Sequence, residues 1–178
     1  GIEVGYAELT GLQKHILQVA RKHDRVTITA TQMMESMIES PVPTRAEVSD
    51  VATAIYEGAD AVMLSAESAA GNYPVEAVRT MHNVAVSVES DSTYAQVIAA
   101  FRTVERSTVA DGIVAAAREI AESTDIKAIC CFTESGTTAI KVARERPQLP
   151  ILALSPSVFT LRRLCLVWGV RCFATGKI

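Results

Sequence analysis

Apolar residues recur along this chain in two alternating patterns. In residues 6–23 they return at steps of three and four, which predicts a helix that buries one stripe. Short β-branched or aliphatic runs, such as Val26–Ala30 and Ala61–Leu64, have the length and composition of buried strands. The stripe of the first helix consists of Leu9, Leu12, Ile16 and Val19.

The same two patterns continue to the end of the chain and predict an α/β fold. Further helices are expected to begin at Thr44, Pro74, Thr108 and Val158, and another directly after the segment Thr133–Thr138. The helix at Thr44 opens with a capping box, in which Thr44 and Glu47 can satisfy each other's backbone N–H groups. Further strands are expected at 127–132, 151–154 and 170–173. Strands that alternate with helices through short loops indicate right-handed crossovers and parallel sheets.

The polarity of the chain divides it into two parts. Residues 1–89 carry the first set of elements, residues 90–106 read as a polar linker, and residues 107–178 carry the second set. Two strands and three helices cannot close a barrel, and three strands without a final helix make an incomplete α/β domain. We therefore expect both parts to be pieces of larger domains, and both ends of the sequence to be cut.

Charge and composition exclude several function classes. The formal net charge is -3, so the chain lacks the basic surface that nucleic-acid binding requires. No apolar run approaches the length of about 18–20 residues that a membrane span needs. The four cysteines form no C-x-x-C pair, which argues against zinc and favours reduced thiols. A cytoplasmic location is the resulting expectation.

Candidate chemistry lies where predicted strands end, because functional groups gather at the carboxyl edge of parallel sheets. A dense polar and thioether segment, Thr29–Met37, follows the first strand, and Ser65–Ser68 follows the second. Hydroxyl groups there can also serve only to cap backbone groups. The residues alone leave both interpretations open.

Four segments of the first half of the chain together carry a family resemblance: Ile28–Met37, Pro43–Glu47, Asp50–Ala52 and Gly58–Glu67. With these segments, the chain resembles pyruvate kinase. The resemblance runs from residue 1 to about 88 and continues more loosely to 178, as the first part of that family's carboxy-terminal domain. Ala66 and Ser68 stand where many relatives carry Gly and Thr.

The resemblance implies a fold and a reaction. The first part would be a partial (β/α)8 TIM barrel, from helix six to helix eight, followed by an incomplete parallel α/β regulatory domain. The complete enzyme would transfer a phosphoryl group from phosphoenolpyruvate to ADP, giving pyruvate and ATP in glycolysis. It would use Mg²⁺ or Mn²⁺ together with K⁺, and it would be a homotetramer.

The resemblance also assigns roles to residues of this chain. Thr31 matches the threonine that contacts the substrate, and Ser65 and Glu67 match residues with a supporting role in hydrogen bonding and proton relay. No metal ligand is expected within the chain, since the metal-binding Asp and Glu and the catalytic Lys fall upstream of Gly1. The chain alone is therefore expected to be inactive.

A third candidate is the hydroxyl-rich segment between a predicted strand and helix. Amide hydrogens at a helix start favour an anion, and hydroxyl groups add donors. A simple N-cap at Thr137 or Thr138 is the alternative, and an inward-facing Glu134 would oppose a phosphate. In pyruvate kinases the matching loop receives the phosphate of a sugar-phosphate or nucleotide activator. The candidate residues are Thr133, Ser135, Gly136, Thr137 and Thr138.

Two other interpretations of the function of the chain are possible from the sequence. The chain could be a non-catalytic module that binds phosphometabolites. It could also be part of another barrel enzyme that uses phosphoenolpyruvate, although the segments around Thr44–Glu47 and Ser65–Ser68 argue against this.

Overall fold

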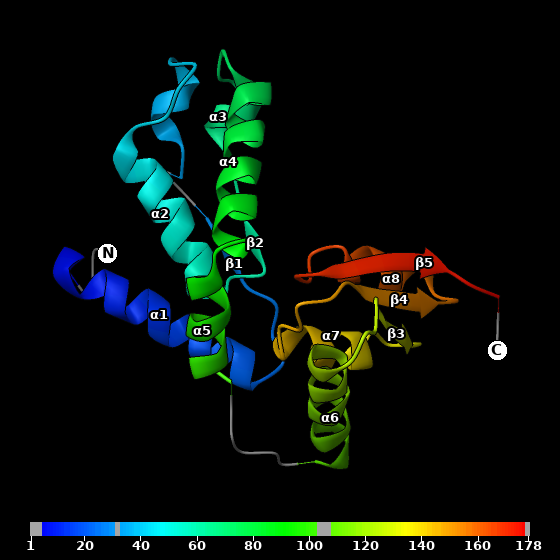
Figure 1. The fold of residues 1–178 in the computed structure, drawn as a ribbon. Helices are drawn as coiled ribbons and strands as arrows, with labels where there is room; N and C mark the ends of the chain where they lie inside the picture. The colour runs from blue at the N-terminus through cyan, green and yellow to red at the C-terminus, as the bar shows by residue number, and fades with distance from the viewer. Residues whose placement is uncertain (1–4, 31–32, 103–107, 177–178) are drawn as a thin grey trace. The chain divides into compact units, whose positions relative to one another are not determined.

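The computed structural model describes residues 5–30, 33–102 and 108–176. The chain forms two compact units (Figure 1). The first contains the described parts of residues 1–17 and 27–101, and the second those of 18–26 and 102–178. Both units are α/β, as the alternation of patterns predicts, and neither contains a closed barrel among the described residues.

The first unit is built mainly of helices around two very short strands. Its elements in chain order are α1 (Tyr6–Lys22), β1 (Ile28–Thr29), the 3₁₀ helix η1 (Glu35–Ile38), α2 (Arg45–Tyr56), β2 (Ala61–Val62), α3 (Ala66–Ala69), α4 (Pro74–Glu89) and α5 (Ser92–Ala100). The last five residues of α1 group with the second unit. Helix α2 begins at the predicted capping box, in which Thr44 and Glu47 satisfy each other's backbone N–H groups.

The two strands of the first unit pair in parallel. Ile28 lies opposite Ala61, and Thr29 lies opposite Val62. The carboxylate of Asp60 accepts the backbone N–H of Thr27 at 2.9 Å, which ties the starts of the two strands together. Because the strands are parallel and in register, their carboxyl ends lie at the same edge.

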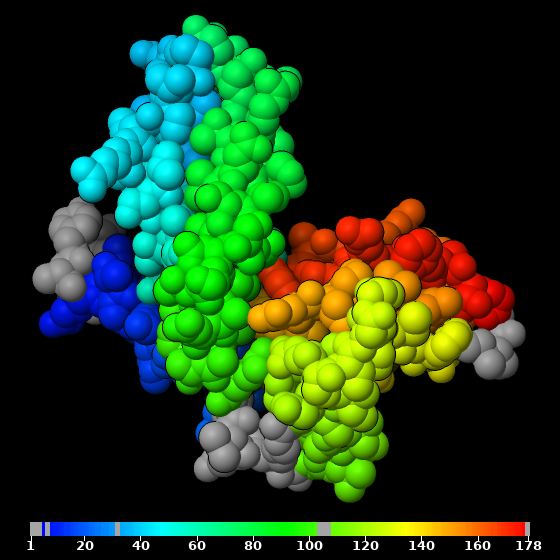
Figure 2. Space-filling view, viewed as in Figure 1, coloured from blue at the N-terminus to red at the C-terminus, as the bar shows by residue number. Residues whose placement is uncertain are grey.

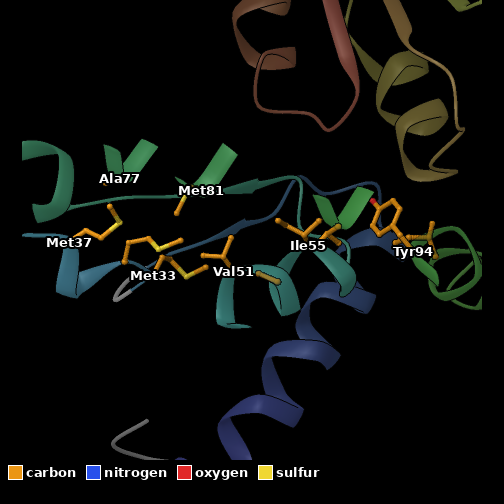
Figure 3. Packing of buried hydrophobic residues seen from close by; sticks show 11 residues of the cluster. Met33, Met37, Val51, Ile55, Ala77, Met81 and Tyr94 are labelled. Carbon is orange, nitrogen blue, oxygen red and sulfur yellow. The ribbon is translucent and has the colours of Figure 1, made fainter. Parts of the chain in front are cut away.

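The core of the first unit lies between the sheet and the helices α2 and α4 (Figure 3). These two helices pack side by side along their length (Figure 2). Three methionines from the segment after β1 are fully or almost fully buried, and flexible thioethers fill irregular space of this kind well. The main members of the core are Met33, Met34, Met37, Val51, Ile55, Ala77, Met81 and Tyr94.

Two expectations about the first unit need correction. Residues 92–100 were predicted as linker but form α5, because Asp91 caps the helix start and the side chains of Tyr94 and Ile98 are buried in the core. The apolar stripe of α1 was predicted to be buried. Leu9, Leu12, Ile16 and Val19 are instead exposed by 36–54%, because no described element covers that face.

The second unit is a three-stranded parallel sheet with its helices. After α6 (Val109–Ser123), strands alternate with helices in the predicted order: β3 (Ile129–Phe132), α7 (Thr137–Arg144), β4 (Ile151–Ser155), α8 (Val158–Leu164) and β5 (Val170–Ala174). Neighbouring strands pair in chain order. The core combines one face of the sheet with residues of α6, α7 and α8, among them Val114, Cys131, Val142, Ile151 and Leu164.

The grouping of residues 18–26 with the second unit also differs from the expected boundary at residue 89. Val26, predicted as the start of a strand, packs against the core of the second unit. The carboxylate of Asp24 forms ion pairs with Lys141 and Arg144 of α7. Among the described residues, no helix is both long and apolar enough to cross a membrane.

Candidate functional site

The first candidate site lies after β1 and β2, at the edge where both strands end. Thr31, predicted to contact the substrate, falls outside the described residues. The segment that follows it, from Met33 to Ile38, is described and leads into η1. The other two candidate residues of this site are Ser65 and Glu67. They lie at the start of α3, shortly after β2.

Glu67 links the two strand ends. One oxygen of its carboxylate, Oε1, accepts the backbone N–H of Met34 at 3.2 Å. The other, Oε2, accepts the backbone N–H of Ser65 at 2.7 Å. The structure thus brings Glu67 and Ser65 together and attaches both to the segment that follows β1.

The environment of Glu67 keeps its carboxylate ionised. Burial by itself would raise the pKa of this group, since only 3% of the residue is exposed. Backbone N–H groups of Glu67 itself, Ser65 and Met34 outweigh burial and hold the pKa below its ordinary value. An ionised carboxylate with both oxygens occupied is an acceptor and a positioning group, and it has no proton to donate.

Ser65 is free of the capping role that competed with a chemical one. It is the residue before α3, yet its side chain makes no capping hydrogen bond. The residue is exposed at the strand end, and its backbone N–H is the group that binds Glu67. Its hydroxyl can therefore donate to or accept from a bound molecule.

A second glutamate in this region has a role that the sequence pattern did not reveal. Glu47 completes the capping box with Thr44, as predicted, but it also binds Ser36 in η1. The backbone N–H of Ser36 donates to Oε1 at 2.6 Å, and its hydroxyl donates to Oε2 at 2.5 Å. A capping box is a local signal, and nothing in it indicates a partner 11 residues earlier.

The candidate effector loop joins β3 to α7 in the second unit, as predicted. Gly136 is the N-cap of α7, with a left-handed φ of 89°, so neither Thr137 nor Thr138 has the capping role weighed for it. The N–H of Gly136 donates to the hydroxyl of Thr133 at 2.9 Å. The hydroxyl groups of Ser135 and Thr137 lie 3.0 Å apart.

This loop has the features of an anion site. The first intrahelical bond of α7 runs from Ile140 to Gly136. Within the described parts of the chain, the amide hydrogens of Thr138 and Ala139 find no acceptor. Thr137 and Thr138 are exposed beside them, and Glu134 is exposed as well. Five candidate residues are thus brought into one turn: Thr133, Ser135, Gly136, Thr137 and Thr138.

Helix α8 supports the loop from the next crossover. The hydroxyl of Thr160 donates to the carbonyl oxygen of Glu134 at 2.6 Å. A Cβ at Gly136 would lie 3.2 Å from Leu164 Cδ2, so the helix packs directly against the glycine. These supports were absent from the sequence-based site because they lie more than 20 residues further along the chain.

The opposite end of α7 carries a charged cluster. Lys141 binds Asp111 at 2.6 Å and Asp24 at 2.9 Å, and Arg144 binds Asp24 at 2.7 Å and Asp111 at 3.2 Å. The hydrogen bond from Lys141 is the main reason why the pKa of Asp111 lies far below its ordinary value. Asp111 in turn raises the pKa of Lys141. Both ends of the helix are therefore held by polar contacts.

A metal site is not among the described features. In residues 5–30, 33–102 and 108–176, no three His, Cys, Asp or Glu side chains group in a way that could hold a metal ion. Glu47 and Glu67, the two carboxylates near the first site, use their oxygens on N–H and O–H donors. These residues do not fit a metal-binding role.

Comparisons with known proteins agree with this geometry. Residues 1–78 match the family model for the pyruvate kinase barrel domain, and residues 111–177 match that for the pyruvate kinase alpha/beta domain. A curated pyruvate kinase of Methylorubrum extorquens is 51% identical over 175 residues, which cover 98% of this chain and 37% of that protein. One from Agrobacterium vitis is 46% identical over 170 residues, covering 96% and 36%.

A solved structure shows the same fold. The crystal structure of a pyruvate kinase from Cryptosporidium parvum superposes with a TM-score of 0.93 at 34% identity, over 100% of this chain and 37% of that one. The chain spans little more than a third of the length of these relatives. Its two units correspond in order to the barrel and alpha/beta domains of the family models. The chain belongs to the pyruvate kinase family, and it carries part of each of these two domains.

Proposed function

We propose that this chain is part of an enzyme that transfers a phosphoryl group from phosphoenolpyruvate to ADP, giving pyruvate and ATP. The observation that supports this most is the 51% identity to a protein named pyruvate kinase, which extends over nearly the whole chain and through both units. A cytoplasmic location and a role in glycolysis are part of the same proposal.

In this proposal the chain contributes one wall of the substrate site. The hydroxyl of Thr31 donates a hydrogen bond to the carboxylate or enolate oxygen of the substrate, and it does so without bringing a charge that must be desolvated. Ser65, exposed at the neighbouring strand end, adds a second hydroxyl. Glu67 holds the two strand ends together through its hydrogen bonds, and the supporting role in proton relay that the resemblance implies belongs to the same proposal.

Metal ions enter the proposal as components of the complete enzyme. Phosphoryl transfer requires positive charge near the transferring group, which Mg²⁺ or Mn²⁺ supplies when bound, together with K⁺ in this family. Glu47 and Glu67 are engaged with hydrogen-bond donors, and we assign the metal ligands and the catalytic lysine to other parts of the enzyme. The chain by itself is expected to be inactive.

A regulatory role is proposed for the loop before α7. A phosphate of a sugar-phosphate or nucleotide effector would accept from the amide hydrogens of Thr138 and Ala139 and from nearby hydroxyl groups. Thr133 and Gly136 shape the turn, and Ser135 and Thr137 supply exposed hydroxyls. We propose a homotetramer as the assembled state of the complete enzyme.

The reaction is tested by expressing the protein that contains this chain and measuring pyruvate formation from phosphoenolpyruvate and ADP with Mg²⁺ and K⁺ present. Pyruvate formation that depends on ADP is expected. The isolated 178-residue chain serves as a parallel sample and is expected to show none. Effector binding without turnover in the longer protein would favour a non-catalytic module that binds phosphometabolites.

The regulatory role is tested with Thr137→Glu, which places a negative charge in the first turn of α7. This variant is expected to lose activation by a sugar phosphate and to keep basal turnover, because a carboxylate there repels the effector phosphate. Val109→Glu is the matched control, since Val109 is 82% exposed in the first turn of another helix of the same unit. Undiminished activation of Thr137→Glu would argue against this loop as the effector site.

A further inference from the structure

The segment after β1 is attached to two glutamates that come from different elements. Met34 donates its backbone N–H to Glu67, which lies after β2, and Ser36 donates its backbone N–H to Glu47, which lies in the first turn of α2. The two amide groups are two residues apart. The backbone that follows Thr31 is thus held at two neighbouring points by carboxylates.

The contacts of Glu47 exceed what capping a helix requires. Its carboxylate accepts four hydrogen bonds, two from Ser36 and two from the backbone N–H and hydroxyl of Thr44. All four distances lie between 2.5 and 2.8 Å. Charge-assisted hydrogen bonds of this length are about twice as strong as neutral ones. The helix start and η1 are therefore joined through one side chain.

We propose that Glu47 is a positioning residue for the substrate site, which it serves by fixing Ser36 and with it the described backbone from Met33 to η1. This inference rests on the proposed phosphoenolpyruvate site at Thr31. The segment leaves a two-residue strand. Its methionines are buried in the core, but they are flexible side chains, so the two carboxylates add directional contacts that packing alone does not give.

The charges of Glu47 and Glu67 favour a positioning role for Glu47 over an incidental contact on the surface. Glu47 and Glu67 are close enough for the charge of Glu47 to raise the pKa of Glu67. Placing two carboxylates near each other is unfavourable unless donors offset the repulsion. Each carboxylate here has donors from the same segment, so removing either one releases part of that backbone.

A second capping box in this chain suggests a variant that separates the two roles of Glu47, capping α2 and binding Ser36. In α6, Asp111 occupies the position equivalent to Glu47 and completes a capping box with Thr108, at 3.0 and 3.2 Å for the two backbone N–H contacts. Aspartate therefore suffices for the cap. Glu47→Asp is expected to keep the contacts with Thr44 and, being one methylene shorter, to lose those with Ser36.

The test compares wild type, Glu47→Asp and Glu39→Gln in the protein that contains this chain. Glu39 is an exposed neighbour, and changing its side chain leaves in place the backbone hydrogen bond that its N–H donates to the carbonyl oxygen of Ser36. Glu47→Asp is expected to lower kcat/KM for phosphoenolpyruvate by about ten-fold or more, because small displacements of substrate-contacting groups slow a reaction strongly. The thermal midpoint is expected to fall by only a few degrees, because the contacts with Ser36 are lost while those with Thr44 are kept, and Glu39→Gln is expected to behave as wild type.

Hydrogen exchange at the Ser36 amide gives a second readout that does not depend on activity. Faster exchange in Glu47→Asp, together with the kinetic loss, supports the proposal. Unchanged exchange in Glu47→Asp would show that Glu47 does not hold the Ser36 amide. Faster exchange with kcat/KM within about two-fold of wild type would show that Glu47 holds Ser36 but does not position the substrate site. If the wild-type protein shows no turnover at all, the proposed reaction fails, and the exchange experiment still decides whether Glu47 holds Ser36.

Discussion

The backbone N–H of Met34 and the carboxylate of Glu67 are 3.2 Å apart and join the ends of two neighbouring parallel strands. Both residues are buried, with exposed fractions of 0% for Met34 and 3% for Glu67. A buried carboxylate is stable only where donors surround it. This pair therefore connects the stability of the first unit to the geometry of its proposed site.

Replacing Glu67 by alanine is expected to destabilise the first unit. The N–H groups of Met34 and Ser65 would lose their acceptor, and an unsatisfied buried backbone group costs about 1–3 kcal/mol. The free energy of unfolding in urea is expected to fall by an amount of this order. Glu39→Ala, which removes an exposed glutamate near η1, serves as the control and should leave the unfolding curve in place.

The contribution of Glu47 to stability is expected to depend on pH in the acid range. Hydrogen bonds from Ser36 and Thr44 outweigh burial and lower the pKa of Glu47 from 4.5 to about 2. A lowered folded-state pKa means that the stabilisation is fully present above pH 4.5 and is lost as pH falls toward 2. The difference in thermal midpoint between wild type and Glu47→Gln should shrink over that interval. A difference that stays constant from pH 6 to about pH 2 would contradict this assignment.

Two glycines of the second unit should respond to alanine in opposite ways. Gly136 has a φ of 89° and a Cβ there would lie 3.2 Å from Leu164, so Gly136→Ala is expected to lower the free energy of unfolding by about 1–2 kcal/mol or more. Gly112 lies inside α6 with open space around it, so Gly112→Ala is expected to raise it by about 0.5–1 kcal/mol. Denaturant unfolding of both variants checks the contrast, which equal shifts would refute.

The charged cluster at the end of α7 should matter more than an exposed ion pair. Lys141→Met removes a cation whose side chain is 16% exposed and which binds Asp24 and Asp111. The thermal midpoint is expected to fall by several degrees. Lys127→Met removes a side chain that is 81% exposed and pairs with Asp125, and it should shift the midpoint by less than about 1 °C. Comparable shifts for the two variants would show that the cluster adds no stability.

Most of the elements and the places of the described candidate residues could be predicted from the sequence, because those signals are local. The capping box at Thr44 and the glycine-containing turn after β3 depend on neighbours a few residues apart. The same locality explains what was missed. Ser36 and Glu47 are 11 residues apart, and Glu134 and Thr160 are 26 apart, so only the folded chain brings them together.

Burial was the property that the patterns predicted least well. The stripe on α1 is exposed, and on α6 Ile113 and Ile120, which lie on the same face two turns apart, are exposed by 63% and 52%, while Val114 is buried. A periodic pattern shows that a helix has an apolar face, but not which element covers it. The reverse occurred in α5, where a short segment with polar residues at its start buries Tyr94 and Ile98.

The pairing order of the second sheet has a consequence for how this unit is made. Ile129 pairs with Ile151, and Ile151 pairs with Val170, so each strand joins the one that precedes it along the chain. Every pairing then closes a stretch of about 20 residues, which costs less conformational entropy than closing a longer one. The sheet can therefore grow strand by strand while the ribosome is still extending the protein, without waiting for residues synthesised later.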